Sequence, residues 1–225
     1  MAKNKRYHGI QMDGQTMNVP FHFRKTAQAL NFFAIHNSTS KLNVTKAIKL
    51  IWAADRYHLR KFGSLITHDF YLAMTRGPVG SNAKNIAEED DDYIPADILN
   101  YSSQILEHII GHSKSGRVYH EINSKSKFEN DFFMDSELEA FEFSKNKFLK
   151  MEIGGLINLS HEYPEWKIFK NEIEVMGEKS LPINLLYFFD TPQPSDVKHD
   201  EFSLPENILN INKNNFLHEM DLIKR

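Results

Sequence analysis

Apolar residues recur every three or four positions along most of this chain, which is the period of an amphipathic helix. The pattern predicts a first helix over residues 22–37 and a second over residues 43–63. The second helix opens at Asn43, which suits an N-cap, and closes at Gly63, which suits a C-cap. Further helices are predicted over residues 95–111, 136–150, 164–177 and 205–223. We therefore expect a mainly α, compact multi-helix domain.

The residues that follow the second helix have a different pattern. Residues 64–74 are rich in β-branched and aromatic side chains, which favour strands. We expect residues 67–69 to turn the chain, so that a small β-hairpin is inserted directly after the second helix. Gly77 and Pro78 then force a bend, because proline fixes its own φ and restricts the residue before it. Another short strand is expected within residues 114–123.

Single residues mark several helix ends. Ser81 suits the N-cap of the segment that follows the hairpin. Ser136 and Glu139 have the spacing of a capping box at the start of a helix. Gly154 and Gly155 are expected to break that helix from the next one.

The apolar face of the second helix includes one acid, Asp55. A carboxylate on that face must be hydrogen-bonded or paired if it is buried. We expect Arg76 or the backbone amides of the following turn to donate hydrogen bonds to it. Contact with a partner protein is the alternative.

Charge is nearly balanced, with 27 basic and 30 acidic residues and a net charge of −3. No overall field therefore attracts nucleic acid or anionic membranes, and any such contact has to be local. One local basic group is Arg56, His58, Arg60 and Lys61, near the end of the second helix. We interpret it as a solvated face that complements the helix dipole, with DNA contact as the alternative.

A run of five acids precedes the third predicted helix. It consists of Glu88, Glu89, Asp90, Asp91 and Asp92. We expect a solvated loop here, since charged runs are usually surface segments. The alternative is contact with the basic surface of a partner protein through charge complementarity.

The chain offers few side chains for catalysis. It has no cysteine, which excludes disulfides, thiolate zinc sites and cysteine nucleophiles. Glu107, His108 and His112 resemble helical metal ligands, but Gly111 is expected to end that helix, and no third ligand suggests itself. We therefore predict no metal, no cofactor and no catalytic residue.

Two histidines are directly followed by an acid, in His120-Glu121 and His161-Glu162. Neighbouring side chains point apart in a helix or a strand, so neither pair is expected to form a catalytic dyad. His161 is interpreted as a packed histidine whose ring hydrogen-bonds inside the core and orients the helix that carries Trp166.

No apolar run approaches the roughly 20 residues that a bilayer span requires. The basic residues at the start are not followed by the apolar segment of a signal peptide. We therefore expect a cytoplasmic protein without a membrane partner.

Two segments, taken together, resemble a known family. They read VTKAIKLIWAADRYHLRKFGSLITHDFYLAMTRGPVGS and LINLSHEYPEWKIF. Their ordered motifs are similar to those of the Panacea domain, also called the SocA-like antitoxin domain, of bacterial and phage toxin–antitoxin systems. The signature residues are Asp55, Arg56, His58, Gly63, Thr67, Asp69, Arg76, Gly77, Pro78, Val79, His161 and Trp166. His68 and Gly80 depart from the pattern, because family members often have Gly and Pro at these positions.

The resemblance implies a helical domain over residues 21–180, between an N-terminal extension (1–20) and a C-terminal extension (181–225). It implies an antitoxin that neutralises a co-encoded toxin by direct binding, or that hands the toxin to a protease. No catalysis is implied. A DNA-binding regulator of its own operon and a metal-dependent hydrolase are the alternatives.

Overall fold

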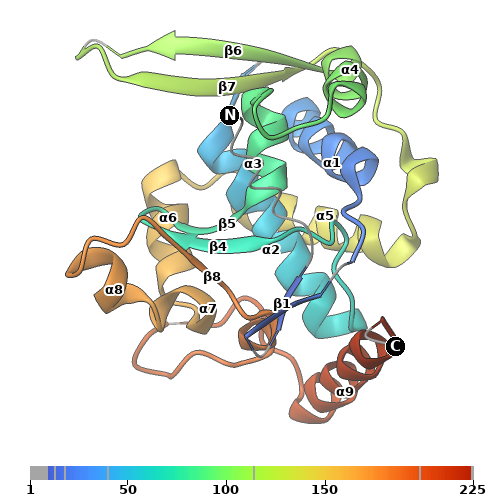
Figure 1. Cartoon of the computed structure of the whole chain (residues 1–225), viewed down its shortest axis with the longest axis vertical. Coiled ribbons are helices and arrows are strands. Elements are labelled where there is room, and N and C mark those ends of the chain that lie inside the picture. The colour runs from blue at the N-terminus through green and yellow to red at the C-terminus, as the bar shows by residue number, and fades with distance from the viewer. Residues whose placement is uncertain are drawn as a thin grey trace.

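The computed structural model arranges the chain as helices around one central helix, with small sheets between and beside them (Figure 1). The described residues are 10–12, 14–17, 19–39, 41–113, 115–197 and 199–223. Within these ranges, no helix combines the length and the apolar composition that a membrane crossing needs. Residues 1–9 of the expected N-terminal extension lie outside the described part.

Helix α2 (Val44–Phe62) is the central helix. The Asn43 side chain caps its start by accepting a hydrogen bond from the Lys46 amide over 3.4 Å. Gly63 ends it in the left-handed region, at φ +82°. Both ends match the sequence prediction, since both depend on local capping chemistry. The helices packed against α2 are α1 (Phe23–His36), α3 (Ser81–Glu88), α5 (Asp135–Phe148), α6 (Ile153–His161) and α9 (Glu206–Ile223).

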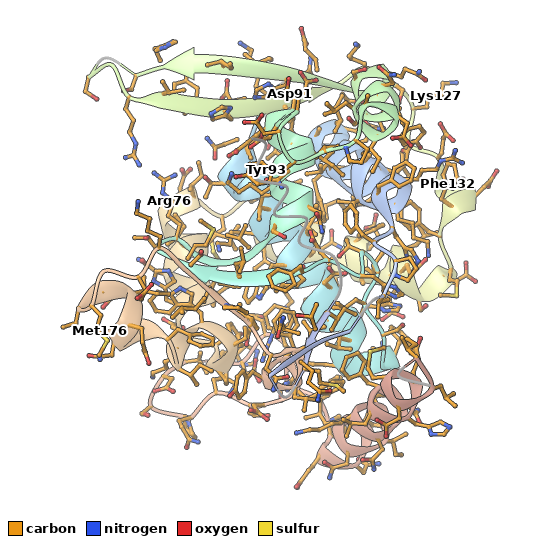
Figure 2. All side chains as sticks on the ribbon, in the orientation of Figure 1. Arg76, Asp91, Tyr93, Lys127, Phe132 and Met176 are labelled. Atoms are coloured by element: carbon orange, nitrogen blue, oxygen red, sulfur yellow. The ribbon has the colours of Figure 1, made fainter. Side chains whose placement is uncertain are left out.

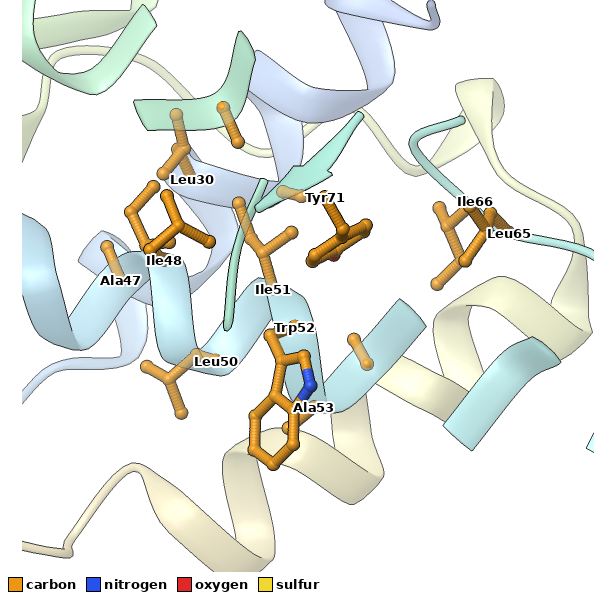
Figure 3. Packing of buried hydrophobic residues seen from close by; sticks show 14 of the residues in the cluster. Leu30, Ala47, Ile48, Leu50, Ile51, Trp52, Ala53, Leu65, Ile66 and Tyr71 are labelled. Atoms are coloured by element: carbon orange, nitrogen blue, oxygen red, sulfur yellow. The ribbon is translucent and has the colours of Figure 1, made fainter. Parts of the chain in front are cut away.

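Because helices surround it, α2 is buried on most of its circumference. The consecutive residues from Leu50 to Ala53 are each at most 1% exposed, and Leu50, Ile51 and Trp52 point in different directions from the helix (Figure 3). The same burial covers the polar residues Lys49, Asp55, Arg56, His58 and Arg60. Their polar groups therefore need partners inside the protein.

Small antiparallel sheets accompany the helices, so the fold is mixed α/β with a majority of helix rather than purely helical. One sheet has the order β5-β4-β8, and another has the order β3-β7-β6. The strands are β1 (Ile10–Met12), β2 (Gln15–Met17), β3 (Leu42–Asn43), β4 (Tyr71–Met74), β5 (Gly77–Gly80), β6 (Leu106–His112), β7 (Val118–Ser124) and β8 (Ser180–Pro182).

The hairpin after α2 differs from the predicted one. Its strands are β4 and β5, joined through Thr75 and Arg76, with Leu72 opposite Val79. Residues 64–70 form no strand and lead from α2 into β4. The reason is that two carboxylates, described below, take the backbone amides in this segment that a strand would use for its ladder.

The helix predicted over residues 95–111 is also wrong in its second half. Helix α4 (Ala96–Ile105) ends at Ile105, and strand β6 follows without a break. Strand β6 pairs along its whole length with β7, where the sequence predicted a short strand. The two strands form a long hairpin beside α4 (Figure 1). Pairing with β7 decided this segment against its helical period.

Three local predictions in the second half need correction. The helix that ends near residue 150 is indeed separated from the next one, but the break between α5 and α6 lies at residues 149–152, and Gly154 and Gly155 lie inside α6. The helix predicted over 164–177 is two short ones, α7 (Pro164–Lys167) and α8 (Lys170–Glu174). At the start of α5, Glu137 rather than Glu139 accepts the hydrogen bond from the preceding backbone, the Met134 amide, over 2.9 Å.

Segments on both sides of residues 21–180 pack on the core. Ile10 and Met12 of β1 are buried. Two short 3₁₀ helices, Asn130–Phe132 and Leu185–Phe188, connect longer elements. Helix α9, predicted from its period, packs against α2.

Candidate functional site

Asp55 is fully buried and is held entirely by hydrogen bonds. Its carboxylate accepts from the Ile66 amide at 2.9 Å, the Thr67 amide at 3.2 Å, the Thr67 hydroxyl at 2.5 Å and the Tyr71 hydroxyl at 2.8 Å. Burial raises the pKa of Asp55 to about 6, although the hydrogen bonds oppose the shift. Backbone amides of the following turn therefore donate to Asp55, which was one of the two expected kinds of donor. Arg76 instead donates to Thr45 Oγ1 over 3.3 Å.

Asp69 ties the start of α3 to the loop after α2. It accepts from the Phe70 amide at 2.7 Å, the Asn82 amide at 3.0 Å and the Ala83 amide at 2.8 Å. The last two are free amides of the first helical turn, so Asp69 caps α3 from a distance. Ser81, the expected cap, has a buried hydroxyl without a hydrogen-bond partner in the described part of the chain. Burial raises the pKa of Asp69 to about 7.

Arg56 forms a buried ion pair that sequence reasoning missed. Its Nη1 lies 2.5 Å from Glu165 Oε2, and both side chains are fully buried. Trp52 Nε1 donates to the other Glu165 oxygen over 2.9 Å, and the guanidinium lies over the Tyr163 ring. The available signal was the charge itself, since an arginine on a buried helix requires hydrogen-bond acceptors elsewhere in the protein.

Arg60 and His58 are likewise internal. Arg60 Nη1 donates to the carbonyl oxygens of Phe188, Phe189 and Asp190 at 2.8–3.0 Å. His58 bonds through Nδ1 to the Ser64 carbonyl oxygen at 2.7 Å. The interpretation of this basic group as a solvated face is therefore wrong. Of its four residues, only Lys61 is partly exposed, and it pairs with Glu139.

The bend at Gly77 and Pro78, called the Gly-Pro corner below, covers the buried amine of Lys49. Gly77 has φ +95°, and a Cβ there would overlap Ser160 Oγ and lie 2.6 Å from Lys49 Nζ. Lys49 Nζ donates to the Pro78 carbonyl oxygen over 2.6 Å. Like Glu165, Lys49 was not predicted as a site residue. It lies between two core residues of an otherwise apolar stretch.

His161 and Trp166 stack on each other next to this corner. Their rings are parallel within 4°, with centroids 3.6 Å apart. Trp166 Nε1 donates to the Met74 carbonyl oxygen over 2.7 Å, which ties α7 to β4. The expected hydrogen bond of the histidine ring is absent at Nε2, which has no partner among the described residues. The His161 ring therefore contacts the helix that carries Trp166 by stacking, without the expected hydrogen bond at Nε2.

His108 and His112, whose spacing resembles that of helical metal ligands but for which no metal was predicted, lie outside any helix. They lie on strand β6, where His108 Nε2 contacts His120 Nδ1 of β7 at 2.9 Å. Glu89 lies 3.9 Å from the other nitrogen of His108. Across the part of the chain that the structure describes, no group of three or more His, Asp or Glu side chains could hold a metal ion.

The five acids divide between a helix end and a turn. Glu88 belongs to α3 and pairs with Lys84, and Glu89 follows the helix at φ +51°. Glu89, Asp91 and Asp92 are exposed, as is the adjacent Tyr93 (Figure 2). This exposed turn differs in character from the signature residues, most of which are internal.

The chain was compared with protein families, curated proteins and solved structures. The family model described as Antitoxin SocA-like, Panacea domain matches residues 48–167, which is more than half of the chain. No curated protein and no solved structure matches the chain. The matched range contains Asp55, Asp69, the Gly-Pro corner and the Arg56–Glu165 pair. The chain therefore belongs to the SocA-like antitoxin family with a Panacea domain.

Proposed function

We propose that this protein is an antitoxin that neutralises a co-encoded toxin by direct protein–protein binding. The observation that carries the proposal is membership of the SocA-like antitoxin family across the centre of the fold. The family suggests a role without catalysis. We propose that the toxin is either occupied directly or handed to a protease.

The signature residues are mostly buried, whereas the acidic turn after α3 is exposed, and this separation supports a binding role. The signature carboxylates, arginines and glycines hold helices and loops together from within. A binding protein needs such a rigid scaffold, while its specificity depends on exposed loops that can differ between relatives.

We assign the toxin contact to the acidic turn after α3. Glu89, Asp91 and Asp92 are exposed, and Tyr93, 44% exposed, stands beside them. Acids at an interface steer a basic partner, and an aromatic residue supplies contact area. Glu88 already pairs with Lys84, and Asp90 is partly buried, so these two acids contribute less.

Operator binding through the basic end of α2 lacks support. The Nη groups of Arg56 and Arg60 donate to Glu165 and to backbone carbonyl oxygens inside the protein, and both side chains are fully buried. A phosphate cannot reach these side chains without opening the core. A metal-dependent hydrolase also lacks a ligand cluster in the described residues.

The test is co-expression with the product of the neighbouring gene. We expect that product to arrest growth when expressed alone, and this protein to restore growth and to co-purify with it. Neutralisation at cellular concentrations requires nanomolar affinity, about −12 kcal/mol. A neighbour that is harmless alone, or lethal despite equal amounts of this protein, would refute the proposal.

Charge reversal tests the assigned contact separately. The double variant Asp91→Lys/Asp92→Lys is expected to slow association with the toxin by about tenfold or more while the melting temperature stays unchanged. The matched control is Glu178→Lys/Glu219→Lys, which makes the same change in net charge at exposed residues elsewhere. Equal effects of the two variants would show a general charge effect and remove the acidic turn from the interface.

A further inference from the structure

A pocket of about 270 Å³ opens between the first half of α2, the β4–β5 hairpin and α3. Its apolar lining comes from Val44 and Ile48 of α2, Met74 of β4 and Val79 of β5. The volume is slightly below that of pockets for drug-sized ligands, so the pocket suits a small organic molecule.

The charges around the pocket do not cancel. Lys49, Arg76, Lys84 and Glu88 line it. Lys84 and Glu88 pair with each other at 2.5 Å. Neither Lys49 nor Arg76 has a carboxylate within ion-pair distance among the residues that the structure describes. The Lys49 amine and the Arg76 guanidinium are therefore two basic groups without a carboxylate in direct contact, and Glu165 acts on Lys49 only at longer range.

Lys49 is the more unusual of the two basic groups, because it is only 1% exposed. A lysine ammonium has three N–H donors. The Pro78 carbonyl oxygen is the one hydrogen-bond acceptor that the described part of the chain gives it. Burial lowers the pKa of Lys49 well below its ordinary value. A nearby anion would favour the charged form of this amine and use its remaining donors.

Arg76 is exposed at the turn of the hairpin (Figure 2). Its one hydrogen bond within the described residues runs from Nη1 to Thr45 Oγ1 at 3.3 Å. A guanidinium carries five donors in a planar fork that matches a carboxylate. Most of its donors are thus available at the pocket.

We propose that this pocket binds a small monoanion with a carboxylate head and a short apolar chain. Lys49 and Arg76 bind the carboxylate, and Val44, Ile48 and Val79 contact the chain. A carboxylate suits the pocket better than a phosphate dianion, because a second charge would add a desolvation cost beside an apolar lining.

The test uses hexanoate and its neutral isostere hexanamide as probes in a two-dimensional amide NMR titration of the full chain. We expect saturable shifts for hexanoate in residues 44–49 and 74–79. Its affinity should exceed that of hexanamide at least tenfold, which corresponds to 1.4 kcal/mol. Equal affinity of the two probes, shifts elsewhere, or no saturation with hexanoate would overturn the proposal.

Two variants test whether hexanoate binding requires the Lys49 amine and the Arg76 guanidinium. Lys49→Met and Arg76→Gln are each expected to weaken hexanoate binding about tenfold and to leave hexanamide binding unchanged. Lys170→Met removes an exposed lysine of α8 and serves as the control with unchanged affinity. If Lys49→Met fails to fold, the exposed Arg76→Gln decides alone, and an unchanged hexanoate affinity in that variant would contradict the assignment.

Discussion

Helix α2 carries four fully buried charged side chains, Lys49, Asp55, Arg56 and Arg60. Each contacts a different kind of partner. Lys49 donates to one carbonyl oxygen, and Asp55 accepts from amides and hydroxyls. Arg56 pairs with an acid, and Arg60 donates to several carbonyl oxygens. A buried charge is costly unless such partners surround it. Truncation of any of these side chains would leave partner groups unpaired, so these positions hold distant segments in place.

The buried carboxyls predict a pH dependence of stability. Burial raises the pKa of Asp69 to about 7 and that of Asp55 to about 6, from an ordinary value of 3.8. The native state therefore keeps protons that the unfolded chain releases from about pH 4 upwards. The stability that these protons contribute is fully present below about pH 4 and is lost as the pH rises through 6 to 7.

The variant Asp69→Asn isolates this effect, because an amide does not titrate. We expect the free energy of unfolding of wild type, relative to the variant, to fall by about 1 to 3 kcal/mol between pH 5 and pH 8. Urea denaturation at both pH values measures it, and Asp91→Asn at an exposed position is the control. A difference between wild type and Asp69→Asn that stays constant with pH would contradict the shifted pKa.

Gly77 is expected to tolerate no side chain. Its φ of +95° disfavours a Cβ, and the added atom would overlap Ser160 Oγ and press on Lys49 Nζ. Gly77→Ala should lower the free energy of unfolding by at least about 1 kcal/mol. Gly154→Ala is the matched control, since Gly154 lies in a helix with open space around its Cβ, and it should be neutral or stabilising. A neutral Gly77→Ala in chemical denaturation would argue against this account.

At the scale of elements, α9 completes the end of α2. Asn212 Nδ2 donates to the carbonyl oxygens of Arg60 at 3.0 Å and Lys61 at 2.6 Å. These carbonyls belong to the last turn of α2, where the helix has no amides of its own to offer. One side chain of the C-terminal helix thus satisfies two groups of the central helix.

Asn212→Ala is therefore expected to destabilise the protein by about 1 to 3 kcal/mol. Asn210→Ala changes the same residue type on the exposed side of α9 and should stay within about 0.5 kcal/mol of wild type. Thermal and urea unfolding measure both. Equal stability of the two variants would mean that α9 rests on α2 through apolar contact alone.

At the scale of the whole molecule, folding should not depend on a metal ion. The histidine pair of β6 and β7 gathers no third ligand within the described residues. We expect purified protein to keep its melting temperature in excess chelator, because loss of a structural ion would remove much folding free energy. A drop of many degrees that zinc reverses would direct attention to His108 and His120.

The sequence by itself determined the features that depend on neighbouring residues. The bounds of α1, both caps of α2 and the position of α9 follow from helical period and capping residues, which act within a few positions. The need for donors at Asp55 also followed, because a carboxylate on an apolar face is costly without them. The ordered motifs predicted the family, which the match over 48–167 confirms.

Only the tertiary structure decided what depends on distant residues. Strand β6 exists because β7 pairs with it, although its own period favoured helix. Arg56 and Arg60 are internal because Glu165 and the carbonyls of residues 188–190 reach them from more than 100 positions away. The pocket beside Lys49 likewise needs α2, the hairpin and α3 together. Periodicity reports which face of a helix is apolar, whereas the partner that covers the other faces is set by long-range packing.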